Sequence, residues 1–518
     1  MDKNIQLKKE KSKLLRVLDY VEMIGNLLPH PATLFIILSV SIVILSAIMG
    51  GMGTNVTYEA VDTTTEAIVQ NTVTAQSLLS ADGIRFIFTN VISNFTSFYP
   101  LGPVFTIILC VGVAEGTGFL SAGLRKIAKV TPKRFVTSMV VLLGIMSNVA
   151  SSTGYVVLVP LGAIIFMSFK RHPIAGLAAA FAGVSGGWSA NLLIGSNDPM
   201  FAGISTEAAS ILDPNYFVQP TSNWYFMVAS TFVITIIATY ITEKVVEPRL
   251  GEYECEERYI VEDISKEEKR GMKFGIISLL IYIFIILALI VPKNGILRNP
   301  ETGGILTSPF MSSIIPIMGG VFLVPGIFYG IGSGTIKNDK DIIELMVKGI
   351  GGISSFLVLI FFAAQFVKYF DYSNIGTIIS VSGARFLEST GFVGLPLIIC
   401  FIILTSIINI FIAVDSAKWV LMAPIFVPMF MRIGLSPELT QVVYRIGDSC
   451  TNVIAPLMPF FALIVAFCQK YDKKVGIGTL ITTMAPYSIG FLVGWTTLFI
   501  VWYIFELPLG PGSEIFLI

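Results

Sequence analysis

Long apolar stretches separated by shorter polar segments run along the whole chain. Nine of them are about 20 residues long, the length that an α-helix needs to cross the hydrocarbon core of a bilayer. These nine predicted transmembrane helices lie near residues 31–52, 98–120, 174–197, 223–242, 273–292, 312–333, 349–369, 437–467 and 479–503. Two further apolar stretches, 134–169 and 391–432, are each interrupted midway by polar residues, so that each half is short for a full span. The pattern predicts an all-α polytopic membrane protein.

The distribution of Lys and Arg indicates that the stretch 134–169 enters the membrane and turns back. Cytoplasmic loops carry an excess of basic residues. Lys and Arg are frequent between residues 125 and 134 and occur again at 170 and 171, so both ends of the stretch belong on the cytoplasmic side. We therefore expect a re-entrant helical hairpin here, well after the first transmembrane helix at 31–53.

A second re-entrant hairpin is expected at 391–432, on the opposite side of the membrane. The acidic segment 54–84 is placed outside and the charged loop 244–272 in the cytoplasm, which makes 391–432 enter from outside. Lys368 and Arg385 fall on the outer side and depart from the rule. Irregular backbone is not tolerated in lipid, so the hairpin tips must be buried in protein or line a wet cavity. We expect the two tips to meet near the membrane midplane.

An internal repeat supports this arrangement. Residues 151–186 and 415–450 align without a gap at an offset of 264 and share eight of 36 residues, whereas unrelated sequences of this composition would share roughly two or three. The identical pairs are Ser152/Ser416, Val156/Val420, Pro160/Pro424, Phe166/Phe430, Met167/Met431, Pro173/Pro437, Gly183/Gly447 and Ser185/Ser449. Five crossings separate the two copies, so they face opposite ways. This inverted duplication, with repeats at 97–243 and 349–505 joined by transmembrane helices in 273–334, is typical of secondary transporters.

Composition and charge narrow the class further. The chain is 54% hydrophobic and 13% charged, with a mean hydropathy of +0.80, which leaves too few polar side chains to cover a soluble globule. The formal net charge is zero, so no basic excess suggests a nucleic-acid partner, and the five cysteines lack ligand spacing. We expect no cofactor, no disulfide and no metal other than a coupling ion.

Residues 1–30 are predicted to form an amphipathic helix on the cytoplasmic face of the membrane. Leu14, Val17, Leu18 and Val21 recur at helical spacing, and the segment is basic but has no apolar core of the kind that signal peptides contain. A soluble linker is the alternative. Either interpretation leaves the N-terminus in the cytoplasm.

The eighth predicted span carries the chemistry that best indicates a substrate. Arg445, Asp448, Ser449 and Asn452 share one helical face, and charged residues in mid-membrane are costly and usually functional. We expect Arg445 and Asp448 to pair. Arg445 would clamp a substrate carboxylate with its planar guanidinium, and the freed Asp448 would hold a proton or a cation. A purely structural ion pair is the alternative.

Ion coupling is assigned to polar residues near the hairpin tips and span breaks. If sodium is the coupling ion, Ser147 and Asn148 at the first tip and Asn409 at the second would supply oxygen ligands. Asp198 is, beside Asp448, a second candidate for the carboxylate that carries the coupling proton or cation. An equal alternative is that Asp198 is an ordinary solvated carboxylate at a helix end. Asp415 and Lys418 flank the second tip and could simply pair with each other.

Two aromatic residues occupy matching places just past the two tips. Tyr155 corresponds to Trp419 at the offset of 264. Anchoring at the membrane interface is the usual role of such residues, but a position past a buried tip favours stacking on a substrate ring or sealing the site. The broken spans add Ser185, Asn191 and Asn452 to the candidate substrate-binding residues.

Four segments of the chain resemble the AbgT family of p-aminobenzoyl-glutamate transporters. They are Val21-Glu22-Met23-Ile24-Gly25-Asn26-Leu27-Leu28-Pro29-His30-Pro31, Ser185-Gly186-Gly187 with Asn191-Leu192-Leu193, Asp415-Ser416-Ala417-Lys418-Trp419, and Tyr444-Arg445-Ile446-Gly447-Asp448-Ser449. The resemblance implies nine transmembrane helices and two re-entrant hairpins in a homodimer at the inner (plasma) membrane. It also implies coupling of aromatic carboxylate uptake, or of sulfonamide-like antimetabolite efflux, to a proton or sodium gradient. The functional residues carried over are Asp198, Asn409, Ser416, Trp419, Pro437, Arg445, Asp448 and Pro456.

Other classes of protein are less consistent with the sequence. A channel would also contain broken helices, but paired opposed tips favour an occluding site. The G-x-S-x-G match at 183–187 follows no strand, and the histidines His30 and His172 lie near the cytoplasmic boundary, so the sequence does not indicate an enzyme. Among transporters, a sodium-coupled dicarboxylate carrier of similar inverted-hairpin architecture is the rival.

Overall fold

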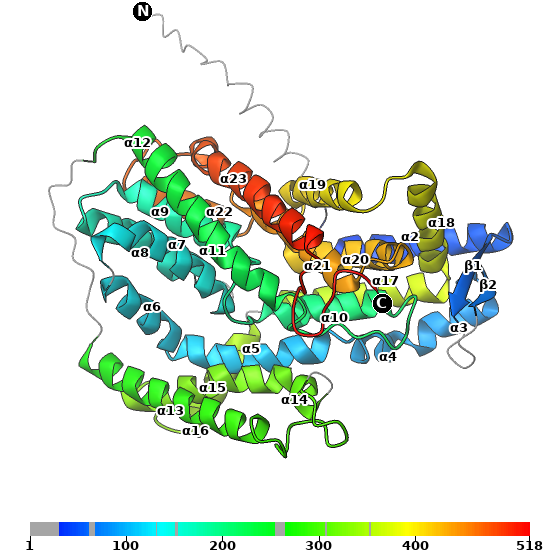
Figure 1. The fold of residues 1–518 in the computed structure, drawn as a ribbon, viewed down its shortest axis with the longest axis horizontal. Coiled ribbons are helices and arrows are strands. Elements are labelled where there is room, and N and C mark those ends of the chain that lie inside the picture. The colour runs from blue at the N-terminus through cyan, green and yellow to red at the C-terminus, as the bar shows by residue number, and fades with distance from the viewer. Residues whose placement is uncertain are drawn as a thin grey trace, which may run out of the picture.

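Figure 1 shows the computed structural model, a helical protein with one β-hairpin at its edge. It describes residue 29 and residues 31–61, 68–130, 132–150, 154–253, 265–305, 308–351 and 354–517. The first helices are α2 (Pro31–Gly51), α3 (Ala81–Thr89), α4 (Val91–Thr96), α5 (Leu101–Gly116), α6 (Phe119–Val130), α7 (Val136–Ser147), α8 (Val159–Ser168), α9 (Pro173–Phe181), α10 (Asn197–Ala209), α11 (Trp224–Ile241) and α12 (Glu247–Leu250). The others are α13 (Lys266–Ile290), α14 (Pro309–Ser312), α15 (Ile314–Ser333), α16 (Asp339–Gly351), α17 (Ser354–Tyr372), α18 (Ile375–Thr390), α19 (Leu395–Phe411), α20 (Asp415–Arg432), α21 (Pro437–Asn452), α22 (Phe461–Gln469) and α23 (Ile477–Ile504).

The long apolar helices identify a multi-pass membrane protein. Within the described residues, five helices are long and apolar enough to cross a bilayer: α2, α11 continued to Leu250, α13, α15 and α23. Helices α16 and α17, bent by 52° at a short break, would together make a sixth. The predicted spans 31–52, 223–242, 273–292, 312–333 and 479–503 each fall on one of the five. The remaining predicted spans fall on shorter or interrupted helices.

The all-α expectation is wrong at the segment after α2. Strands β1 (Asn55–Val61) and β2 (Ile68–Thr74) pair antiparallel, with Asn55 opposite Thr74 and Val61 opposite Ile68. Both strands are rich in Val and Thr, which favour extended backbone. The hairpin is tied to the helical body by the backbone N–H of Gln76, which donates to the carbonyl of Ser373.

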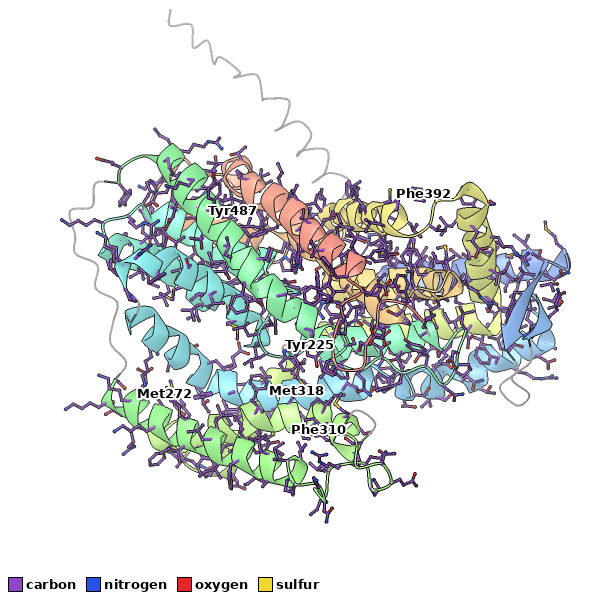
Figure 2. The ribbon with its side chains drawn as sticks, viewed as in Figure 1. Tyr225, Met272, Phe310, Met318, Phe392 and Tyr487 are labelled. Carbon is purple, nitrogen blue, oxygen red and sulfur yellow. The ribbon has the colours of Figure 1, made fainter. Side chains whose placement is uncertain are left out.

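Helices α13 and α15 form a layer against α5, at the bottom of the view in Figure 1. Figure 2 labels Met272 on α13 and Met318 on α15, with Phe310 on the short α14 that precedes α15. Close packing between α5 and α15 depends on a small residue, because an added Cβ at Gly326 would lie 2.8 Å from the Cα of Ala114. This part corresponds to the predicted connecting helices 273–334.

The predicted cytoplasmic loop 244–272 is shorter than expected. Helix α11 continues through a π-helical turn, Thr242–Val246, into α12, and α13 already begins at Lys266. The predicted amphipathic helix 1–30 lies outside the described residues, apart from Pro29.

The two copies of the repeat fold alike where they can be compared. Helix α8 ends with the N–H of Arg171 bonded to the carbonyl of Phe166, and α20 ends with the N–H of Leu435 bonded to the carbonyl of Phe430, both at 2.9 to 3.0 Å. These are equivalent residues at the offset of 264, and the pattern is that of a Schellman cap. Helices α9 and α21 then both begin at a proline, Pro173 and Pro437, a residue favoured in the first helical turn.

A glycine shared by both copies lets the helix after each interrupted stretch approach that stretch. An added Cβ at Gly183 would lie 2.3 Å from the carbonyl oxygen of Val141 in α7. An added Cβ at Gly447 would lie 2.5 Å from the carbonyl oxygen of Ile402 in α19. Only a residue without a side chain allows backbones to approach this closely. The sequence identity of the two glycines therefore reflects the same packing requirement.

Candidate functional site

Four breaks in helices gather the polar residues of the interior. The first lies between α7 and α8, the second at residues 187–196, the third at 412–414 and the fourth at 453–460. The stretch 391–432 contains α19 and α20, separated by residues 412–414, and the described part of 134–169 contains α7 and α8 with a 3-10 turn at 148–150 and a π-helical turn at 154–158 between them. Helix breaks free backbone carbonyl and N–H groups, which can bind ions or substrate inside a membrane protein.

A cavity of about 150 Å³ lies between these breaks and is lined by both copies of the repeat. Tyr155 and Trp188 come from the first copy, and Asp415, Asn452 and Phe460 from the second. Ala413, Val414, Met458 and Pro459 complete the lining. The rings of Tyr155 and Phe460 stack with centroids 4.5 Å apart and an interplanar angle of 8°. The cavity therefore combines flat aromatic walls with one carboxylate and one amide.

Beside the cavity, the buried Lys418 joins the helices on either side of the third break to α21. Lys418 Nζ lies 2.5 Å from Asp448 Oδ1 and also donates to Asn409 Oδ1, and all three side chains are fully buried. The amide nitrogen of Asn409 donates to the carbonyl of Asp448 at 2.7 Å and to Asn452 Oδ1 at 2.8 Å. Helices α19, α20 and α21 are thereby joined by one charge-assisted network. Asp448 Oδ2 has no hydrogen-bond partner among the described residues.

The expected pair between Arg445 and Asp448 is not formed. Arg445 Nη2 instead lies 2.8 Å from Asp198 Oδ1, and Asp448 pairs with Lys418. Helical spacing places Arg445 and Asp448 on one face, but each side chain turns to a charged partner on another helix. Asp198 is 2% exposed, which excludes the solvated helix-end alternative. Its Oδ2 accepts a hydrogen bond from the N–H of Gly195 at 2.6 Å.

Arg445 retains a free donor in this arrangement. Its guanidinium carbon lies 5.1 Å from the ring centroid of Phe201, and its Nε has no hydrogen-bond partner among the described residues. A buried N–H without a partner costs free energy, so a further acceptor at this position would be stabilising.

Asp415 does not pair with Lys418 either. Its Oδ2 accepts a hydrogen bond from Trp188 Nε1 at 2.7 Å, and its backbone carbonyl accepts one from the Tyr444 hydroxyl at 2.6 Å. The N–H of Ser416 donates to Asp415 Oδ1. The bond from Trp188 crosses between the two copies of the repeat at the wall of the cavity.

Trp419 and Tyr155 differ in position although they correspond in the alignment. Tyr155 lines the cavity, whereas Trp419 is fully buried, stacks on Tyr444 with centroids 4.4 Å apart and donates from Nε1 to Ser205 Oγ. The interior position of Trp419 excludes the alternative of interfacial anchoring. It contacts the cavity only indirectly, through Tyr444 and the Asp415 backbone.

Among the described residues of the first tip, the amide oxygen of Asn148 is left without a partner and could bind a cation. Asn148 is 3% exposed and its Nδ2 donates to the carbonyl of Gly187 at 3.2 Å, but its Oδ1 has no partner among the described residues. Ser147 Oγ is engaged with the carbonyl of Gly144 as a donor and can still accept or coordinate. At the second tip, Asn409 Oδ1 is already occupied by the Lys418 ammonium. The expectation that Asn409 supplies this oxygen to sodium therefore fails in the observed conformation.

The remaining candidates lie around the same breaks. Ser185 Oγ contacts Met458 Sδ at 3.3 Å, and Asn452 Nδ2 donates to the Ser185 carbonyl at 3.4 Å. Asn191 donates to the carbonyl of Ile145. Pro456 lies in the break between α21 and α22, whereas Pro437 starts α21 at the far end of that helix. The structure thus brings most of the candidates together and leaves Pro437 apart.

Sequence reasoning missed Trp188 and Phe460 as cavity residues and misjudged the partner of Lys418. The signal for Lys418 was present, because a lysine within an apolar stretch must find an anion. Tyr444 gave no signal of its own, since a buried tyrosine between apolar residues looks like ordinary packing.

The long apolar helices and the buried charged residues around the helix breaks define a multi-pass membrane protein with an aromatic-lined cavity between those breaks. The profile of the AbgT putative transporter family matches residues 16–517, and the chain belongs to this family. It is 39% identical over 494 residues to the p-aminobenzoyl-glutamate transport protein of Escherichia coli (strain K12), covering 95% of this chain and 96% of that protein. Its relatives are named as transport proteins, so the chain is a transporter and not an enzyme.

Two solved structures share the fold. The YdaH transporter of Alcanivorax borkumensis is 41% identical, with a TM-score of 0.87 over 93% of this chain and 100% of that chain. MtrF of Neisseria gonorrhoeae is 46% identical, with a TM-score of 0.91 over 96% of this chain and 100% of that chain, and is described as illuminating a class of antimetabolite efflux pumps.

Proposed function

We propose that this chain is an ion-coupled secondary transporter of aromatic carboxylates of the p-aminobenzoyl-glutamate and p-aminobenzoate type, which also exports sulfonamide-like antimetabolites. The observation that carries the proposal is the aromatic cavity between the two copies of the repeat, with Asp415 in its wall. The Escherichia coli relative is named for p-aminobenzoyl-glutamate, and the gonococcal relative for antimetabolite efflux.

The cavity suits the ring of such a substrate. Its volume of about 150 Å³ matches that of cavities known to admit a benzene-sized molecule. The aminobenzoyl ring would lie against Tyr155 and Phe460, and its amino group would donate to the carboxylate of Asp415. An aliphatic dicarboxylate would leave the aromatic walls unused, which disfavours the rival dicarboxylate carrier.

Arg445 is proposed to bind the substrate carboxylate in exchange for Asp198. Its free Nε offers a first contact, and a bidentate contact with the substrate would then release Asp198. Asp198, rather than Asp448, is thus the carboxylate that an arriving anion frees to take a proton or a cation. Asp448, held by Lys418, keeps a coupling role only if that pair opens.

The coupling ion is a proton or sodium. Sodium would be bound at the first tip by Asn148 Oδ1 and Ser147 Oγ together with carbonyls freed by the break, because among the described residues there Asn148 Oδ1 has no partner and Ser147 Oγ can still accept. A proton would be carried by Asp198 after its release from Arg445.

The proposal includes the topology predicted from the sequence. Nine transmembrane helices and two re-entrant hairpins, 134–169 and 391–432, would place the two copies of the repeat in opposite orientations. The chain would act as a homodimer in the inner (plasma) membrane with a cytoplasmic N-terminus. The shared Schellman caps and glycine contacts support the repeat itself.

The test of the proposal is uptake into proteoliposomes that contain the purified protein. We expect saturable uptake of p-aminobenzoyl-glutamate driven by a sodium or a pH gradient, each imposed separately, and no comparable uptake of an aliphatic dicarboxylate. Uptake without saturation or without a gradient would indicate a channel. Preference for the aliphatic compound would favour the dicarboxylate carrier.

A substitution at Arg445 tests, in the same assay, the proposed contact between its guanidinium and the substrate carboxylate. Arg445→Lys keeps the charge but loses the planar fork, so we expect transport to fail. The matched control is Arg249→Lys, at an exposed arginine on α12. Wild-type affinity and rate in Arg445→Lys would show that the residue is only structural.

A further inference from the structure

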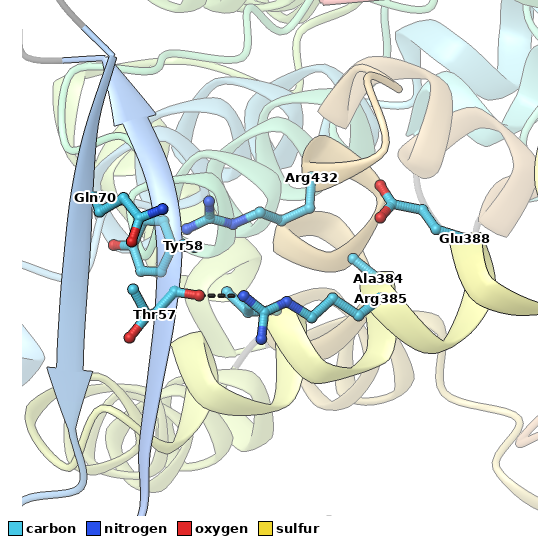
Figure 3. A pocket seen from close by; sticks show the side chains of 8 residues that line it. Thr57, Tyr58, Gln70, Ala384, Arg385, Glu388 and Arg432 are labelled. Atoms are coloured by element: carbon cyan, nitrogen blue, oxygen red, sulfur yellow. Dashed lines mark hydrogen bonds between the residues drawn. The ribbon is translucent and has the colours of Figure 1, made fainter.

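A second, larger cavity lies at the opposite end of α20 from the central one. Its volume is about 560 Å³, within the range of small-molecule sites. It is lined by Thr57, Tyr58 and Gln70 of the β-hairpin, by Val381, Ala384, Arg385 and Glu388 of α18, and by Arg432, the last residue of α20. Figure 3 shows Arg432 and Arg385 reaching across it toward β1.

We call this second cavity, lined by the β-hairpin, α18 and Arg432, the outer cavity. Its two arginines give it a positive character. Arg432 is half-buried, with its guanidinium carbon 3.7 Å from the ring centroid of Tyr58, and its Nε has no hydrogen-bond partner among the described residues. Arg385 donates to the carbonyl of Thr57. Neither guanidinium forms an ion pair within the described part of the chain. With Glu388 as the one lining carboxylate, two positive charges face one negative charge.

The wall of the outer cavity is held in place by contacts between its elements. Asn374 Nδ2 donates to the carbonyl of Thr74 at 2.9 Å, and Thr57 Oγ1 is bonded to Thr72 Oγ1 across the hairpin at 2.8 Å. The stacking of Arg432 on Tyr58 fixes the plane of its guanidinium and leaves its edge free for a planar acceptor. The donors are therefore preorganised before any ligand arrives.

We propose that the outer cavity binds the carboxylate of an organic acid of the transported class, as a capture site separate from the central cavity. Arg432 would hold the carboxylate through its terminal nitrogens, and Arg385 would supply the second positive charge. The cavity is large enough for p-aminobenzoyl-glutamate, whereas the central cavity accommodates a single ring. This inference rests on the proposed function for the identity of the acid. The same oxyanion chemistry would also accept a phosphate, free or in a lipid headgroup.

Calorimetric titration of the full chain in a neutral detergent tests the proposal. We expect p-aminobenzoyl-glutamate to bind at two sites per chain. Arg432→Gln should weaken one of them by at least about tenfold, the effect of losing a charge-assisted hydrogen bond. It should also raise the substrate concentration needed for half-maximal uptake without abolishing transport. The matched control is Arg85→Gln, an exposed arginine on α3, which should change neither.

The other outcomes separate failure of this proposal from failure of the proposed function. A single site abolished by Arg445→Lys and unaffected by Arg432→Gln would overturn the outer site and leave the transport function standing. An Arg432-dependent site that takes inorganic phosphate but not p-aminobenzoyl-glutamate would overturn the carboxylate assignment. If the Arg432-dependent binding of p-aminobenzoyl-glutamate is lost in vesicles of phosphatidylglycerol but kept in vesicles of phosphatidylcholine, the site belongs to a lipid headgroup and the proposal is overturned as well.

Discussion

The buried ion pair between Lys418 and Asp448 leads to a quantitative prediction about stability. Lys418→Met keeps a long side chain in the same space but removes the ammonium, which leaves the Asp448 carboxylate without a cation at 0% exposure. Breaking a buried pair by removing one partner costs about 3–5 kcal/mol. Asn409 also loses the donor to its Oδ1, and this adds to the loss. We expect the free energy of unfolding of Lys418→Met to fall by at least this amount.

The double variant Lys418→Met with Asp448→Asn separates charge from packing. It removes both charges, so most of the lost stability should return, because a neutral pair of similar volume carries no buried charge. Thermal unfolding in detergent, followed with a thiol-reactive fluorophore in a Cys400→Ser background, suits this test, since Cys450 and Cys468 are buried in the folded protein whereas Cys400 is exposed. A single variant as stable as the wild type, or a double variant no more stable than the single one, would refute the reasoning.

Three further predictions concern the packing and the cavity. Gly183→Ala places a Cβ 2.3 Å from a carbonyl of α7 and should cost about 1–3 kcal/mol, while Gly123→Ala in α6, which meets nothing within 4 Å, should not destabilise the protein in the same unfolding assay and should stabilise it by up to about 1 kcal/mol. Trp188→Phe keeps the ring but removes the Nε1–H that donates to Asp415, so uptake should need more substrate for half-saturation; unchanged kinetics would contradict this role. Asn148→Ala should weaken the sodium dependence of uptake at fixed pH, and an unaltered sodium response would transfer coupling to protons.

The apolar pattern predicted those parts of the fold that follow from local sequence. Helix α23 at Ile477–Ile504 matches the expected span 479–503, because a long apolar run without charges has one stable form in a bilayer. Pro173 and Pro437 mark helix starts for an equally local reason. Helix α18 was not predicted, since its polar residues, Arg385 and Glu388 among them, interrupt any long apolar run.

The site depends on contacts between residues that are distant in sequence. The sequence predicted which residues belong to the site better than it predicted which of them form ion pairs and hydrogen bonds with each other. Arg445 and Asp448 were recognised as charges on one face, but Arg445 pairs with Asp198, a residue far earlier in the chain. Helical spacing shows which residues can touch within a helix and carries no information about charges on its neighbours. Trp188 was missed for the same reason, because only the folded chain brings it to Asp415.

The buried group of Lys418, Asn409 and Asp448 also shows how the two copies of the repeat have diverged. At the offset of 264, Lys418 corresponds to Gly154, Asn409 to Ile145 and Asp448 to Val184. Residues 154 and 184 of the first copy are also close together, because a Cβ added at Gly154 would lie 2.0 Å from Ser147 Oγ and 3.0 Å from a methyl carbon of Val184. In the first copy none of these three positions carries a charge, whereas in the second any separation of Lys418 from Asp448 must break a buried ion pair. The two copies have thus become unequal in electrostatic cost: only in the second would moving these helices apart leave a buried charge without its partner.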